Sequence, residues 1–113
     1  MENLIDWDQL DMIADGYTED FVEIYKEFCQ EVPLLFRELE DALSRSDVKA
    51  VASVSHTLKG SSSNFGMIAM GEFLKKIEFH AKNGSLDGLT ETLGETKMVF
   101  ENSIALIRDQ RKI

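Results

Sequence analysis

Residues 18–43 read TEDFVEIYKEFCQEVPLLFRELEDAL, and the apolar side chains of this stretch recur at spacings of three and four. Such spacing places them on one face of an α-helix. Thr18 can cap the first turn, where Glu19 and Asp20 suit the positive end of the helix dipole. Because the apolar phase continues beyond Pro33, we expect one long helix that Pro33 kinks but does not end. The predicted face consists of Phe21, Ile24, Tyr25, Phe28, Val32, Leu35, Phe36, Leu39, Ala42 and Leu43.

Similar patterns on both sides of this stretch predict four further helices. The expected ranges are 7–14, 48–65, 68–82 and 86–107, with the last helix fraying into the basic tail 108–112. Asp6 precedes the first of these, and Ser46 or Asp47 can cap the second. Four amphipathic helices with short connections indicate an all-α fold. We expect an antiparallel four-helix bundle with a short additional N-terminal helix, forming one domain over residues 1–113.

Composition restricts the classes of partner. The chain has 113 residues and a formal net charge of −9, with 12 basic and 21 acidic side chains. This acidity argues against nucleic acid and anionic membranes as partners, since both require clustered Lys and Arg. The chain shows neither a long apolar run nor a signal-peptide pattern at its start, and it has one cysteine. These features predict a cytoplasmic protein, which we expect to be a monomer that acts through another protein.

The predicted helix 48–65 has an unusual outer face. Stepping 100° per residue from His56 places Val51, Leu58 and Phe65 at about 160° to 260°, so His56 points away from the core. Solvent-facing helix surfaces normally carry several charged side chains, but residues 50–66 contain no acid and one lysine, Lys59. Imidazole is partly neutral and nucleophilic near pH 7. An exposed His with a Lys one turn away therefore suits phosphoryl transfer, in which the ammonium can stabilise anionic oxygens.

Gly60 lies one turn after His56 on the same face. A glycine inside a helix costs about 1 kcal/mol relative to alanine, so its presence invites an explanation. One explanation is steric clearance for a partner that must approach the imidazole closely. The alternative is that Gly60 ends the helix, although the apolar phase continues through Ser62 and Phe65.

The run His56 to Gly66, HTLKGSSSNFG, resembles the signature of histidine-containing phosphotransfer (HPt) domains. That signature is an H-x-L-K-G-[SA]-[SA] run closed by a glycine ten residues after the histidine. The similarity extends to Ile5-Asp6-Trp7, to Glu31-Val32-Pro33, to Ile77-Glu78 and to residues 81–84. It implies a four-helix bundle whose histidine accepts a phosphoryl group from the aspartate of a response-regulator receiver domain and passes it on.

The resemblance assigns roles to several residues. It implies that His56 is phosphorylated, through Nε2, that Lys59 lies close to the phosphate and that Gly60 gives clearance. Glu78 matches by spacing a polar residue that orients the imidazole in relatives, where some members carry glutamine. The alternative for Glu78 is a solvated residue at the rim. The expected partners are receiver domains and a hybrid histidine kinase, with Mg²⁺ supplied by the receiver.

The outer face of the same helix is the expected docking surface for a receiver. Its predicted members are Lys49, Ala52, Ser53, Ser63, Met67 and Met70. We expect no metal site on this chain, because His and Cys residues lack ligand spacing. Nucleotide-binding glycine motifs are also lacking. The sequence thus predicts a phosphocarrier, not an enzyme, without an ATP site of its own.

Two alternatives stay open at this point. The same face would serve a binding-only adaptor that docks a receiver without phosphotransfer. The chain could also be the phosphotransfer piece of a larger histidine kinase. The sequence does not specify the donor, the acceptor, the direction of transfer or the signal.

Overall fold

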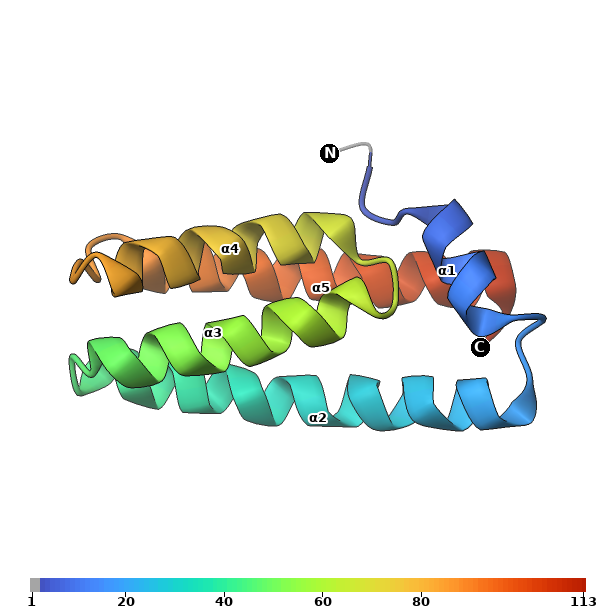
Figure 1. Ribbon diagram of the computed structural model, residues 1–113, viewed down its shortest axis with the longest axis horizontal. Helices are drawn as coiled ribbons and strands as arrows, with labels where there is room; N and C mark the ends of the chain where they lie inside the picture. The colour runs from blue at the N-terminus through green and yellow to red at the C-terminus, as the bar shows by residue number, and fades with distance from the viewer. Residues whose placement is uncertain (1–2) are drawn as a thin grey trace.

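Five α-helices account for most of the computed structural model, which describes residues 3–113 (Figure 1). They are α1 (Trp7–Ala14), α2 (Glu19–Ser44), α3 (Val48–Ser63), α4 (Ile68–Lys82) and α5 (Leu89–Arg111). Helix α3 packs against α2 and α4, and α5 packs against α4 and α2, so the four long helices close into a ring. Within residues 3–113 the fold is all-helical, and the predicted four-helix bundle with a short leading helix is confirmed. Residues 1–2 of the predicted domain lie outside the described range.

Side-chain caps fix where three helices begin. The carboxylate of Asp6 accepts from the backbone N–H of Gln9 at 3.1 Å, and the Thr18 hydroxyl accepts from the N–H of Phe21 at 3.2 Å. Of the two residues predicted to cap α3, Asp47 is the one that does so, at 3.0 Å from the N–H of Ala50. Each cap satisfies a donor that the first turn of a helix leaves without a partner.

The long helix α2 continues through Pro33, which lies on its exposed side. The backbone hydrogen bond that proline cannot donate is therefore lost on the solvent side of α2, and the helix continues past Pro33. Most of the predicted apolar face is buried, but Ile24 is 55% exposed and lies off the core. The buried members are Phe21, Tyr25, Phe28, Val32, Phe36, Leu39 and Ala42.

Three predicted helix boundaries were wrong. Helix α3 ends at Ser63, because a tight turn begins at Asn64 and Phe65 packs among the rings of Phe21, Tyr25 and Phe28. Leu86 lies in the turn before α5, which begins after Gly88 in a left-handed conformation. The predicted fraying after Ile107 does not occur, since α5 stays helical to Arg111.

Arg111 explains why the last turn of α5 is ordered. Its guanidinium donates to both carboxylate oxygens of Asp11 at 2.8 Å and stacks over the Trp7 ring at 4.6 Å. Tyr17 donates to the same carboxylate at 2.6 Å. The bidentate pair and the cation–π contact attach α1 to the end of the bundle.

Gly66 forms the junction between α3, α4 and the N-terminal segment. Its φ of +67° is unfavourable for residues with a side chain, and an added Cβ would lie 2.7 Å from the carbonyl oxygen of Asp6. The Gly66 carbonyl also accepts from the N–H of Asp6 at 2.8 Å. The closing glycine of the HTLKGSSSNFG run is thus required by the fold.

We expect Gly66→Ala to lower the free energy of unfolding by about 2 kcal/mol or more, since it adds both strain and a backbone clash. Gly94→Ala is the matched control: Gly94 lies inside α5 with no atom within 4 Å of an added Cβ. That control should be neutral or gain up to about 1 kcal/mol in helix propensity. Urea denaturation of the two variants checks this, and equal midpoints would contradict the role given to Gly66.

Candidate functional site

The side chain of His56 stands on the outer side of α3, where it is 67% exposed. Its helix neighbours Val51, Ser55, Leu58 and Ser62 face the core, as the helical phase predicts. The hydroxyls of Ser55 and Ser62 donate to carbonyls of their own helix at 2.7 Å, so both are satisfied inside the bundle. The serines therefore serve packing, while the imidazole is presented to solvent.

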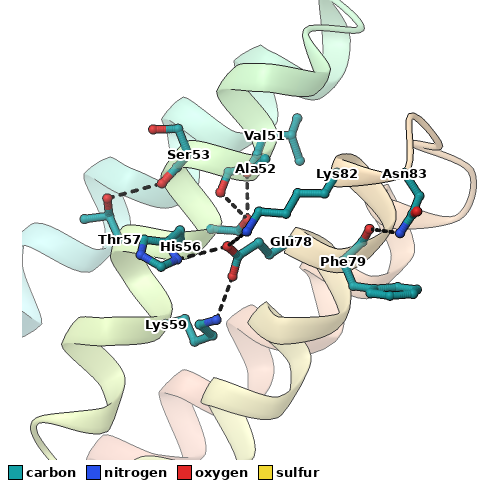
Figure 2. Close-up of polar contacts among 11 residues, drawn as sticks. Val51, Ala52, Ser53, His56, Thr57, Lys59, Glu78, Phe79, Lys82 and Asn83 are labelled. Carbon is teal, nitrogen blue, oxygen red and sulfur yellow. Dashed lines mark hydrogen bonds and ion pairs between the residues drawn. The ribbon is translucent and has the colours of Figure 1, made fainter.

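Glu78 lies beside the ring, on the facing side of α4 (Figure 2). Its Oε2 atom is 2.9 Å from Nδ1 of His56, and its side chain is only 5% exposed. The structure thus excludes the alternative of a solvated rim residue. A buried carboxylate needs compensation, because desolvation disfavours its charged form.

Two lysines provide that compensation. Lys59 of α3 places Nζ 2.7 Å from Oε1 of Glu78, and Lys82 of α4 places Nζ 2.9 Å from Oε2. Figure 2 shows the carboxylate between the two ammonium groups, with the imidazole on a third side. Burial raises the pKa of Glu78, but the hydrogen bonds from Lys59, Lys82 and His56 outweigh it and hold the pKa at about 2.

The ionised carboxylate determines the tautomer of the ring. A carboxylate only accepts hydrogen bonds, so Nδ1 of His56 must carry the hydrogen of the contact with Glu78. In the uncharged ring, Nε2 then keeps its lone pair. The nitrogen on the open side of the ring is therefore the nucleophilic one.

Two hollows lie along the line where α3 meets α4, on either side of His56 and Glu78. The larger, about 600 Å³, contains the predicted docking residues Lys49, Ala52 and Ser53 beside His56. The smaller, about 270 Å³, is lined by Lys59, Gly60 and Ser63. These predicted residues thus lie together around the imidazole.

Met67 and Met70 were wrongly predicted to belong to the docking surface, because both have exposed fractions of 0%. Met70 begins the row that continues with Leu74 and Ile77, and this row faces the core. Met67 follows Gly66 in the turn before α4, so its side chain enters the bundle and only forms the floor of the smaller hollow.

Gly60 is not explained by packing. It lies within α3, so it does not end the helix, and an added Cβ would have no heavy atom within 4 Å. The chain itself would therefore accept a side chain there. Packing within this chain therefore does not require glycine at this position.

Lys82 is the charged residue of this cluster that we did not predict from the sequence. Its signal was its place at i+4 from Glu78, a spacing that brings two side chains together on one helix face.

Among residues 3–113, no group of three or more His, Cys, Asp or Glu side chains is arranged to hold a metal ion. Likewise, none of the helices in that range is long and apolar enough to cross a membrane.

We expect the contribution of Glu78 to stability to depend on pH. Its pKa of about 2 in the folded chain lies below the ordinary value of 4.5, so its stabilising effect is complete above pH 4.5 and disappears as the pH falls towards 2. The unfolding free energy of the wild type minus that of Glu78→Gln should therefore decrease by about 1 to 3 kcal/mol over this window.

Glu72→Gln, an exposed neutralisation on the same helix, is the matched control. Urea titrations at several pH values between 5 and 2 measure the difference. A pH-independent difference for Glu78→Gln, or the same dependence for Glu72→Gln, would contradict the buried ion cluster.

Several known proteins are similar to this chain in sequence or in fold. A family model of the Hpt domain matches residues 23–110. The phosphorelay intermediate protein rdeA of Dictyostelium discoideum is 29% identical over 107 residues, which are 95% of this chain. The chain spans 42% of the length of that relative. A crystal structure of histidine-containing phosphotransfer protein B from Pseudomonas aeruginosa has the same fold, with a TM-score of 0.90, 21% identity and coverage of 99% and 97% of the two chains.

Proposed function

This chain belongs to the Hpt domain family, and on that premise we propose that His56 carries a phosphoryl group between receiver domains of a phosphorelay. Members of this family are phosphocarriers and not enzymes in the usual sense. The observation that carries the proposal is the contact of Nδ1 of His56 with the buried carboxylate of Glu78, at 2.9 Å, on a ring that is otherwise exposed. We expect the donor and acceptor to be response-regulator receivers, one of them attached to a hybrid histidine kinase. A cytoplasmic location and a monomeric state remain predictions.

The transfer step is a displacement at phosphorus. The lone pair of Nε2 attacks the phosphorus of an aspartyl phosphate on the receiver, a P–N bond forms and the P–O bond breaks. The aspartate leaves as a carboxylate with the bonding electron pair. Positive charge develops on the ring during attack, and the carboxylate of Glu78 stabilises it through Nδ1–H. Mg²⁺ on the receiver would neutralise charge on the phosphoryl oxygens.

Lys59 would act on the transferred group. It is one turn from His56 on the same helix, and its side chain is 35% exposed while its ammonium holds Oε1 of Glu78. An ammonium so placed can turn towards phosphoryl oxygens without leaving the site. We expect the phosphoryl group to come from the aspartyl phosphate of a receiver domain.

We expect His56→Gln to abolish phosphoryl uptake. Incubation with a phosphorylated receiver should give acid-labile, alkali-stable label on the wild type and none on the variant, because an amide offers no nucleophilic ring nitrogen. His80→Gln, a change of the other histidine, should leave the label in place. Label that persists in His56→Gln would refute the assignment. Receiver binding without label on the wild type would favour the binding-only adaptor.

Gly60→Leu should slow transfer at least tenfold, because a side chain at that position would hold the receiver away from the imidazole. Since an added Cβ meets no atom of this chain, the variant should melt at or above the wild-type temperature. Gly94→Leu on α5 makes the same change away from His56 and should transfer at the wild-type rate. Transfer at an unchanged rate in Gly60→Leu would remove the clearance explanation.

A further inference from the structure

All charged side chains that line the two hollows beside His56 come from α3 and α4. Helix α3 contributes lysines alone, whereas α4 contributes both signs. Among these groups, Glu78 is the one that contacts the ring. The complete set is Lys49 and Lys59 from α3, and Glu72, Lys75, Glu78 and Lys82 from α4.

A buried glutamate beside the ring has two opposing effects. It stabilises positive charge on the ring during attack, but it also favours protonation of the resting ring. A doubly protonated imidazole has no lone pair on Nε2 and cannot act as a nucleophile. A neutral amide would not create this conflict. The chain therefore needs a group that limits the attraction of Glu78 for a cationic ring.

Lys82 is placed to do this. Its Nζ lies 2.9 Å from Oε2 of Glu78, the same oxygen that lies 2.9 Å from Nδ1 of His56. Lys59 instead holds the other oxygen, Oε1. With both lysines charged, Glu78 and its two counter-ions carry a net charge of +1, and a proton on the ring would add a second positive charge to an already positive group.

We propose that Lys82 is a positioning residue that shares Oε2 of Glu78 with His56 and so weakens the attraction of this carboxylate for a second proton on the ring. The importance of an uncharged ring rests on the proposed phosphotransfer function. The electrostatic effect itself does not rest on that function, because it concerns protonation of His56 in the free protein. Lys82 is 63% exposed, so its removal leaves no cavity in the core.

The test is an NMR titration of the His56 ring in the full chain without any phosphoryl donor, followed through its ring nitrogens. Removing a nearby cation favours the protonated ring, so in Lys82→Met the titration should move to higher pH by about half a unit to one unit. Lys82→Arg restores the cation and should return the titration to that of the wild type. Lys75→Met removes a lysine of α4 that has no contact with Glu78 and should move the titration by less than about 0.2 units.

Two results would overturn the inference. One is an unchanged titration in Lys82→Met, and the other is an equal displacement in Lys75→Met. Thermal melts of each variant verify that the bundle is intact. If the fold of Lys82→Met were lost, failure of the folded Lys82→Arg to match the wild-type titration would count equally against the proposal.

Failure of this inference is distinguishable from failure of the phosphotransfer function. If His56 takes up no label but the titration responds to Lys82→Met, the electrostatic role holds and the function is wrong. If label is taken up normally and the titration does not respond, the inference alone fails. If both the phosphotransfer function and the role of Lys82 hold, the pH dependence of the rate of phosphoryl uptake in Lys82→Met should move in the same direction as the ring titration.

Discussion

The buried carboxylate of Glu78 is the interaction on which the site depends. It links α3 to α4 through Lys59 and His56, and it fixes which ring nitrogen faces the partner. One negative charge, 5% exposed, is stable there because both of its oxygens hold an ammonium group. The bundle supplies this arrangement from two neighbouring helices, so the geometry follows from helix packing and does not depend on a mobile loop.

Charge is divided unequally over the bundle. Helices α3 and α4 contain five lysines and two glutamates, whereas α2 alone contains eight acidic and two basic side chains. The net charge of −9 therefore describes the rest of the molecule and not the side that carries His56. An anionic phosphorylation site on the proposed receiver partner would be attracted more strongly to the α3–α4 side than to the acidic side of α2.

Periodicity was sufficient to predict the fold because four long amphipathic faces leave few ways to bury apolar surface. His56 was placed correctly because the same helical phase that buries Leu58 turns the imidazole outward. The burial of Met70 could also have been predicted, from its spacing to Leu74 and Ile77 in one row. The burial of Met67 could not, since it depends on the tight turn at Gly66 and not on a helical repeat. The contact of Lys82 with Glu78 could have been predicted, since the two residues lie at i and i+4 on α4. The contacts of Glu78 with Lys59 and His56 require the position of α4 relative to α3, which no local pattern contains.

The contact of Arg111 with Asp11 joins residues that are 100 positions apart, and Figure 1 shows α1 and the last turns of α5 at the same end of the bundle. Such a topology suits insertion into, or fusion with, a longer polypeptide, because linkers on both sides would leave from one place. The domain could then be linked to a neighbouring module at its α1 end, while the two hollows beside His56 stayed accessible to a receiver.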